Sequence, residues 1–349
     1  MREKIDNILR AAIEFKASDI HLTVGVPPIF RINGDIKRYG KEILLPDDTE
    51  EIAKLTIPES MYDLFKEKGE LDYSYGVPGV SRFRCNAYHQ RKSVSLALRV
   101  VASKTPTIED LKLPPIIPQL CEKPQGLILV TGPTGSGKST TLASMIDYMN
   151  RTMRKHIITL EDPIEYLHKH GNCIIDQREV GFDTKSYANG LKGALRQDPD
   201  VILVGEMRDL ETIGIAITAA ETGHLVFGTL HTSSAPATIN RIIDVFPPEQ
   251  QPQIRVQLAS VLVGVISQRL FPTTDGKGRR AATEIMVNNP AIANLIRSEK
   301  VHQIQSTMQT SRSQGMHTLE MSIKELIDRG IIQTDAATKY LQEKMMLDG

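Results

Sequence analysis

The stretch Gly132-Pro133-Thr134-Gly135-Ser136-Gly137-Lys138-Ser139 matches the pattern G-x-x-x-x-G-K-[ST] at every required position. A continuous apolar run at residues 127–130 precedes it, as expected of a strand buried on both faces. A helical pattern follows it from Lys138 to about Asn150. Glycines let the backbone N–H groups of such a loop face phosphate oxygens, and the helix N-terminus adds partial positive charge. The stretch therefore predicts a phosphate-binding loop between a buried strand and a helix.

Individual residues of this loop have expected roles. Lys138 is expected to reach the β- and γ-phosphates of a nucleoside triphosphate, and the Ser139 hydroxyl to bind Mg²⁺, with Thr140 alongside. The alternative is a glycine-rich turn that binds nothing, and the flanking strand and helix argue against it. The loop does not select a reaction, because kinases, GTPases, helicases and motors share it. The predicted nucleotide-binding residues are Gly132, Pro133, Thr134, Gly135, Ser136, Gly137, Lys138, Ser139 and Thr140.

Further apolar runs extend the fold prediction beyond the loop. Strands are expected at residues 157–160, 201–204 and Leu225–Leu230, with helical stretches between them. Strands that alternate with helices predict a parallel sheet in an α/β domain. After Pro247 the chain is expected to be mostly helical, with C-terminal helices from about residue 288.

The residues before the loop have a different pattern. Residues 5–13 show the apolar stripe of a helix, and residues 71–101 show the alternation of half-buried strands. Residues 1–102 are therefore predicted to form an α+β domain with an antiparallel sheet.

Residues 103–125 contain five prolines, which interrupt helices and sheets. This segment is therefore the expected linker to a core at residues 126–349. Those prolines are Pro106, Pro114, Pro115, Pro118 and Pro124.

Glu206 follows the apolar run of residues 201–204 and is separated from it by one glycine. A carboxylate at the end of a buried strand lies at the sheet edge beside the phosphate loop, where it can hold Mg²⁺ or its water. We therefore expect Glu206 to be a metal ligand together with Ser139. The alternative is a surface ion pair between Glu206 and Arg208.

Three carboxylates, Glu161, Asp162 and Glu165, follow the strand expected at residues 157–160. Pro163 keeps this stretch from forming a helix, so an acidic loop is expected at the same sheet edge. Hydrolysis of ATP needs a group that orients and deprotonates the attacking water. Glu161 and Glu165 are the candidates for this base, and the sequence does not decide between them. A solvated acidic turn is the alternative.

Two histidines flank the expected strand Leu225–Leu230. His224 and His231 are seven positions apart, so on a regular strand their side chains face opposite sides. One site that binds both is therefore not expected. One of them could sense the γ-phosphate while the other packs, and a purely structural role is the alternative for each.

Composition excludes several classes of protein. The 349 residues include 42 acidic and 42 basic ones, 5% aromatics and no tryptophan, which argues against a nucleic-acid motor. Cys85, Cys121 and Cys173 are too few and too far apart for a disulfide framework or a four-thiolate zinc site. Neither a signal peptide nor an apolar run of about 18 residues is found. We expect a cytoplasmic protein without direct membrane insertion.

Together these motifs resemble one family, the secretion and type IV pilus ATPases. The resemblance covers nearly the whole chain and implies a RecA-like P-loop core, a smaller PAS-like N-terminal α+β domain and a helical C-terminal extension. The segments that carry the resemblance are 132–139, 159–165, Glu206 with its strand, 222–232, 17–22, and 196–200 with 205–209.

Within this family the chain is similar to the branch that retracts pili. It is short, and it lacks the paired CxxC element that extension and secretion members often carry after the histidine segment. Residues 291–297, Ala-Ile-Ala-Asn-Leu-Ile-Arg, resemble a signature of the retraction branch. Ala293 and Ser298 depart from it, standing where the signature has arginine and glutamate. The alternatives are an accessory retraction ATPase, or an ATPase for pilus extension or type II secretion.

The resemblance also assigns roles and partners. Arg84 and Arg99, fifteen positions apart, match two arginines that reach the nucleotide phosphates in this family, with Arg82 and Arg91 as competitors. The implied assembly is a homo-hexamer that uses ATP and Mg²⁺. It would act on an inner-membrane platform protein at the cytoplasmic face, with a paralogous ATPase as a further partner and no nucleic acid. A non-hydrolysing scaffold is disfavoured because all the catalytic segments are present.

Overall fold

The computed structural model describes residues 2–101 and 104–348, with the side chains of 343–348 excepted. The chain forms two compact units. The first contains residues up to Lys104 together with Glu165–Leu167, and the second contains the remainder. The predicted domain boundary at residues 102 and 103 lies outside the described residues. Residues 105–125, expected to be linker, lie in the second unit.

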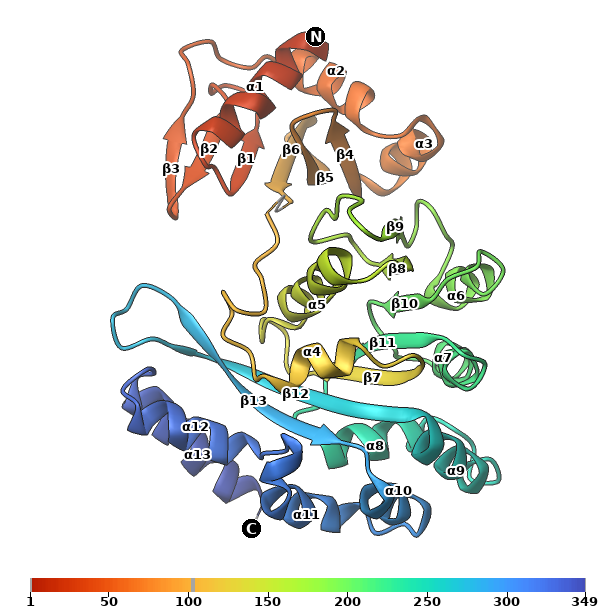
Figure 1. Cartoon of the computed structure of the whole chain (residues 1–349). Helices are drawn as coiled ribbons and strands as arrows, with labels where there is room; N and C mark the ends of the chain where they lie inside the picture. The colour runs from red at the N-terminus through yellow and green to blue at the C-terminus, as the bar shows by residue number, and fades with distance from the viewer. Residues whose placement is uncertain (1, 102–103, 349) are drawn as a thin grey trace. The chain divides into compact units, whose positions relative to one another are not determined.

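The first unit is α+β, as predicted (Figure 1). Its elements are α1 (Arg2–Glu14), β1 (Asp19–Leu22), β2 (Ile29–Ile32), β3 (Asp35–Arg38), α2 (Pro46–Thr56), α3 (Glu59–Lys68), β4 (Glu70–Val77), β5 (Ser81–Gln90) and β6 (Ser93–Val100). The strands pair antiparallel in the order β3-β2-β1-β6-β5-β4. Along β5, Phe83 and Cys85 are buried and Arg84 between them is exposed, which is the expected alternation of a half-buried strand.

The second unit is an α/β domain around one seven-stranded sheet (Figure 1). Its elements are α4 (Ile116–Cys121), β7 (Gly126–Thr131), α5 (Lys138–Thr152), β8 (His156–Glu161), β9 (Ile174–Glu179), α6 (Tyr187–Ala194), β10 (Val201–Val204), α7 (Leu210–Glu221), β11 (Leu225–Leu230), α8 (Ala235–Asp244), α9 (Gln251–Val261), β12 (Leu262–Pro272), β13 (Arg279–Val287), α10 (Pro290–Arg297), η1 (Val301–Gln303), α11 (Ile304–Thr310), η2 (Arg312–Gln314), α12 (Leu319–Asp328) and α13 (Thr334–Asp348). The strand order is β13-β12-β7-β11-β10-β8-β9, and all neighbours are parallel except β12 and β13. The predicted parallel sheet and the helical C-terminal extension are therefore confirmed.

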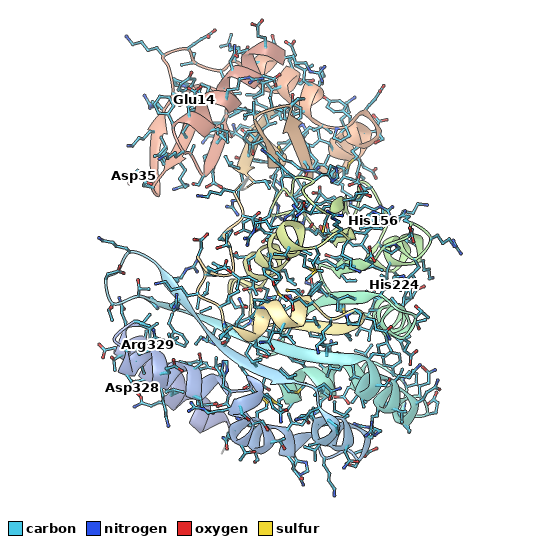
Figure 2. All side chains as sticks on the ribbon, viewed as in Figure 1. Glu14, Asp35, His156, His224, Asp328 and Arg329 are labelled. Carbon is cyan, nitrogen blue, oxygen red and sulfur yellow. The ribbon has the colours of Figure 1, made fainter. Side chains whose placement is uncertain are left out.

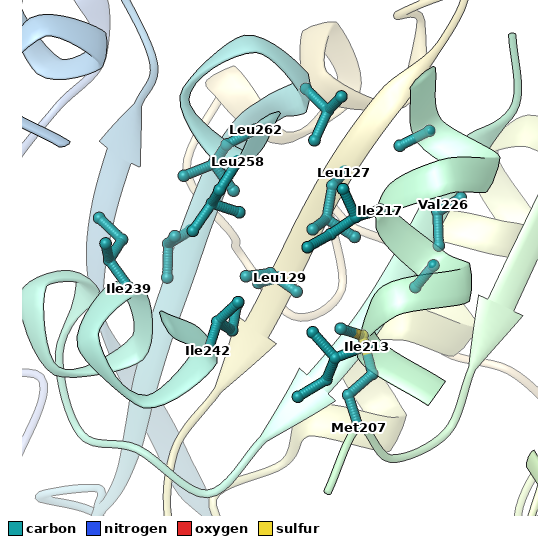
Figure 3. Close-up of a cluster of buried hydrophobic side chains, with 14 of the residues drawn as sticks. Leu127, Leu129, Met207, Ile213, Ile217, Val226, Ile239, Ile242, Leu258 and Leu262 are labelled. Atoms are coloured by element: carbon teal, nitrogen blue, oxygen red, sulfur yellow. The ribbon is translucent and has the colours of Figure 1, made fainter. Parts of the chain in front are cut away.

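Both faces of this sheet are buried. On β7, Leu127 and Leu129 join a core with helices α7 to α11, whereas Ile128 and Val130 join a second core with α4 and α5. Figure 3 shows Leu127 and Leu129 among the packed side chains of the first core. Because alternate residues of a strand point to opposite faces, a strand covered on both sides needs the continuous apolar run that β7 has.

The chain after Pro247 is expected to be mostly helical, and this expectation is wrong for two segments, which form the strands β12 and β13. β12 and β13 pair along nine residue pairs, and β12 also pairs with β7. A short apolar run such as that of residues 262–266 is compatible with either a buried helix or a strand. Its place between β7 and β13 decides the matter, because both neighbours supply hydrogen bonds to a strand. The edge strand β9 was likewise not foreseen, since only Ile175 and Glu179 in it are buried.

Two smaller expectations concern cysteines and membrane spans. All three cysteines are buried. Across residues 2–101 and 104–348, no helix has the length and apolar character needed to cross a bilayer.

Candidate functional site

The loop between β7 and α5 has the backbone that phosphate binding requires. Gly132 and Gly137 have φ angles of 141° and 89°, which disfavour residues with a side chain. A Cβ at Gly132 would also lie 2.4 Å from the backbone oxygen of Gln268. The N-cap residue of α5 is Gly137, which has no side chain that could cap the helix. The N-terminus of a helix attracts anions through its first N–H groups and its partial positive charge.

The side chains of this loop add further polar groups. Lys138 Nζ donates hydrogen bonds to the carbonyl oxygens of Gly132 (2.8 Å) and Pro133 (3.2 Å), so the amine lies against the loop. Ser136 is buried, and in the described part of the chain its Oγ has no hydrogen-bond partner. A buried hydroxyl without a partner costs free energy that a phosphate oxygen would recover. The residues present therefore fit the phosphates of a nucleotide.

Gln268 of β12 supports the phosphate loop, and it is not among the predicted site residues. Its side chain is 2% exposed. Its Nε2 donates to the backbone oxygen of Ser136 at 2.7 Å, and its Oε1 accepts from Thr141 Oγ1 at 2.9 Å. Gln268 therefore ties the loop to the first turn of α5. The only signal for it in the sequence is a polar residue within an apolar run, which is not specific.

Replacing Gln268 with leucine should weaken nucleotide binding. The change removes the hydrogen bonds that Gln268 makes to the Ser136 carbonyl and the Thr141 hydroxyl in a buried place, which costs about 1–3 kcal/mol for each group. We expect a lower midpoint of thermal unfolding and at least tenfold weaker ADP affinity in calorimetric titration. Gln257→Leu is the matched control, because the Gln257 side chain on α9 donates a hydrogen bond to the surface residue Glu221. Unchanged ADP affinity in Gln268→Leu would contradict the assigned role.

The carboxyl ends of four parallel strands place the predicted segments at one edge of the sheet. The strands β7, β11, β10 and β8 are neighbours in that order. They are followed by the phosphate loop, His231, Glu206 and the acidic loop, respectively. Because parallel strands end at the same edge, the segments that follow them meet there, which is where open α/β sheets bind ligands.

Glu206 forms the centre of a small polar cluster at this edge. His231 Nε2 lies 2.8 Å from Glu206 Oε1, and Arg208 Nε donates to the same oxygen. The Glu206 side chain is 18% exposed, whereas those of His231 and Arg208 are 45% and 74% exposed. The surface pair of Glu206 with Arg208 that the sequence suggested as an alternative is thus present, in addition to the contact with His231.

The other predicted histidine is not part of this cluster. His224 precedes β11, so it lies at the edge of the sheet opposite to the phosphate loop (Figure 2). Its Nδ1 is 3.0 Å from the carbonyl oxygen of Ala219, and its own carbonyl accepts the N–H of Gly126 at 3.0 Å. Of the two predicted histidines, His231 follows β11 at the end of the sheet where the phosphate loop follows β7, whereas His224 precedes β11. A catalytic role for His224 therefore has no support from the contacts of this unit.

The three carboxylates of the acidic loop have different surroundings. Glu161 Oε1 accepts hydrogen bonds from Thr159 Oγ1 at 2.6 Å and from Gln177 Nε2 at 3.0 Å, which orient its carboxylate. Asp162 is exposed. Glu165 is also exposed and belongs to the first unit, whereas Glu161 belongs to the same unit as the phosphate loop.

Two further residues shape this loop without having been predicted. Glu179 of β9 is 1% exposed and accepts the N–H of Ile164 at 3.1 Å. Tyr187 of α6 lies near the carboxylates: burial raises the pKa of its phenol, and the charges of Asp162 and Glu206 raise it further. Both residues come from segments outside the recognised motifs, so only the folded sheet brings them to the site.

The two arginines predicted from the family resemblance are neighbours in the first unit. Arg84 of β5 and Arg99 of β6 are directly paired across the sheet, and both are exposed. Arg99 Nε donates to Asp19 Oδ1 at 2.8 Å. Of the two competitors, Arg91 lies in the turn at the far end of the same hairpin, whereas Arg82 lies two residues before Arg84 in β5, opposite Gly76 of β4.

Comparison with known proteins identifies the family to which this chain belongs. A model of the type II/IV secretion system protein family matches residues 92–342. The type IV pilus retraction ATPase PilT of Pseudomonas aeruginosa is 49% identical over 337 residues, which cover 95% of this chain and 96% of that protein. A twitching motility protein of Neisseria gonorrhoeae is 46% identical over 315 residues, covering 90% and 84%. A crystal structure of the pilus retraction motor PilT with bound ADP matches with a TM-score of 0.88 and 51% identity over 96% of each chain. This chain is an ATP hydrolase that belongs to the type II/IV secretion system protein family.

Proposed function

We propose that this chain is the motor ATPase that retracts type IV pili. The observation that carries the proposal is the sheet edge, where the phosphate loop, the Glu206–His231 pair and the acidic loop follow neighbouring parallel strands. Similarity to PilT over nearly the full length of both chains supports retraction as the task. The working form is a homo-hexamer on an inner-membrane platform protein at the cytoplasmic face, with a paralogous ATPase as a further partner.

The nucleotide is ATP with Mg²⁺ in this proposal. Lys138 and the N–H groups at the start of α5 bind the phosphates, while the Ser139 hydroxyl and the Glu206 carboxylate are the metal ligands. Hydroxyl and carboxylate oxygens are the donors that Mg²⁺ prefers, and phosphates and water commonly supply its other ligands. When bound, Mg²⁺ supplies positive charge that neutralises the phosphates. The side chains described include no cluster of three or more His, Cys, Asp or Glu that could hold a metal by themselves.

Glu161 is the proposed general base. Two hydrogen bonds hold its carboxylate at the end of β8, in the unit that contains the phosphate loop. We expect Glu161→Gln to lower kcat by about 10²–10⁴-fold, the usual contribution of a general base. Glu165→Gln is the matched comparison and should lower kcat less than tenfold. The steady-state rate of phosphate release measures both, and a larger loss in Glu165→Gln would reverse the assignment.

Arg84 and Arg99 are proposed to stabilise the phosphate charge that develops during hydrolysis, as the family resemblance implies. The two residues are cross-strand neighbours in the sheet, and both are exposed. Arginines in this role contribute about 10³–10⁵-fold to kcat in other P-loop enzymes. The double variant Arg84→Ala/Arg99→Ala should therefore lose at least about 10²-fold in kcat. Arg91→Ala, an exposed arginine of the same hairpin, is the control, and an unchanged kcat in the double variant would refute the role.

The direction of force needs a test in cells. Deleting the gene and imaging the pili should yield hyperpiliated cells that no longer twitch, and the wild-type gene should restore twitching. Bald cells would instead indicate an extension ATPase. Complementation with Lys138→Ala tests whether the phosphate loop, rather than the mere presence of the protein, is required.

A further inference from the structure

A cavity of about 430 Å³ lies in the second unit, apart from the residues assigned to ATP. Its walls are residues 112–116 of the proline-rich segment, strand β13, residues 312–317 and helix α12. The volume lies within the range of about 300–1,000 Å³ that is typical of small-molecule sites.

The lining of this cavity is strongly basic. Lys112, Arg280, Arg312 and Arg329 line it, and Glu325 is its only carboxylate among the lining residues. Glu325 Oε1 lies 3.3 Å from Arg329 Nη1, near the end of α12 where Figure 2 labels Arg329. The whole chain has a net charge of zero, so this concentration of positive charge does not reflect overall composition.

Two of these basic groups, Arg280 and Arg329, repel each other. Burial lowers the pKa of the Arg280 guanidinium, and the neighbouring charge of Arg329 lowers it further. Among the side chains that the structure describes, no carboxylate forms an ion pair with Arg280, Arg312 or Lys112. An anion beside Arg280 and Arg329 would offset the repulsion between them and the partial burial of Arg280.

The inner wall of the cavity is polar and rigidly held. His317 Nε2 lies 2.9 Å from Thr283 Oγ1, and the backbone of His317 exchanges two hydrogen bonds with Ile285 of β13. Burial lowers the pKa of His317, which favours its neutral ring at neutral pH. Ile116, Met316 and Leu326 add apolar surface. Cationic groups beside polar and apolar walls suit a ligand with phosphates on an organic body.

We propose that this cavity binds a small phosphorylated molecule of about nucleotide size, at a site distinct from the phosphate loop. Thr283 in its wall stands directly opposite Gln268 across the β12–β13 pair, and Gln268 holds the phosphate loop through Ser136. A ligand that contacts Thr283 would therefore lie next to the strand pair that contains Gln268, whose side chain supports the ATP site.

Binding of inorganic pyrophosphate to the full-length protein tests the proposal. Saturating Mg²⁺–ADP fills the phosphate loop first, and pyrophosphate is then titrated in a calorimeter. One pyrophosphate per chain is expected, with affinity at least about tenfold weaker in Arg280→Gln/Arg329→Gln, since each lost arginine removes charge-assisted hydrogen bonds. Arg241→Gln/Arg297→Gln, which removes two exposed arginines elsewhere, should bind as the wild type does.

Three results would overturn the proposal. These are no binding to the wild type, equal binding to the Arg280→Gln/Arg329→Gln variant, or equal displacement by citrate, which would indicate an unselective anion surface. A change of oligomeric state in that variant without pyrophosphate binding would assign the cavity to contacts between copies of the chain and would also overturn it. If Arg280→Gln prevents folding, Lys112→Gln replaces it, because Lys112 is exposed and lies outside the helices and strands.

Discussion

Lys138→Ala is expected to abolish measurable ATP turnover while the protein stays folded. The Lys138 amine lies within hydrogen-bonding distance of two carbonyl oxygens of the phosphate loop, so it is already positioned where phosphates would bind. Loss of a positioned positive charge from a phosphoryl-transfer site costs catalysis on the order of 10³-fold or more. The lost hydrogen bonds to the loop should cost the fold only about 1–2 kcal/mol.

The experiment compares phosphate release and the midpoint of thermal unfolding for the wild type and two lysine variants. Lys192→Ala is the matched control, because Lys192 forms a surface pair with Glu211 on neighbouring helices. It should turn over ATP at the wild-type rate. Turnover by Lys138→Ala within tenfold of the wild type would remove the phosphate loop from the proposed site. Loss of turnover together with loss of folding would show a structural role instead.

Glu206→Gln should have the second largest effect, a fall in kcat of about 10²–10⁴-fold. Glutamine keeps the shape of the side chain and an oxygen that can accept from His231, but it lacks the negative charge. The present carboxylate is 18% exposed, and one of its oxygens accepts from Arg208 and lies 2.8 Å from His231 Nε2, so its charge is held in place. A metal ligand without its charge binds Mg²⁺ more weakly, and the Mg²⁺ concentration for half-maximal rate should therefore rise.

Two readouts separate the metal role of Glu206 from a purely structural one. The Mg²⁺ titration of kcat should shift in Glu206→Gln, whereas a structural role would leave its midpoint unchanged. Glu211→Gln, an exposed carboxylate at the start of α7, should match the wild type in both kcat and Mg²⁺ dependence. Full activity of Glu206→Gln, or of the wild type after thorough chelation of Mg²⁺, would contradict the proposed metal site.

Much of the ATPase core was predictable because its signals are local. The loop at residues 132–139 lies between an apolar run and a helical run, and the structure has β7 and α5 at those places. Continuous apolar runs predicted β10 and β11 correctly, since strands buried on both faces cannot carry polar residues without cost. Alternation likewise identified the antiparallel sheet of the first unit.

The missed elements have weaker local signals. β12 contains Gln268 and Arg269 within an apolar run, so neither the period of a helix nor that of a strand is clear. β9 is an edge strand whose outer positions are polar. In both cases, hydrogen bonds from neighbouring strands distant in sequence decide the conformation, and no local pattern records them.

The sequence alone established a phosphate loop on an α/β core, the acidic residues that follow its strands, and the family. Those features depend on adjacent residues and on which strands are buried. Tertiary structure decided which of these residues meet. Strand order places His231 beside Glu206 and leaves His224 at the opposite edge, and strand pairing makes Arg84 and Arg99 neighbours. It also brings Gln268, Glu179 and Tyr187 to the site. The physical reason is that strand order and register depend on long-range hydrogen bonds and on packing of the two buried faces, which are properties of the whole sheet.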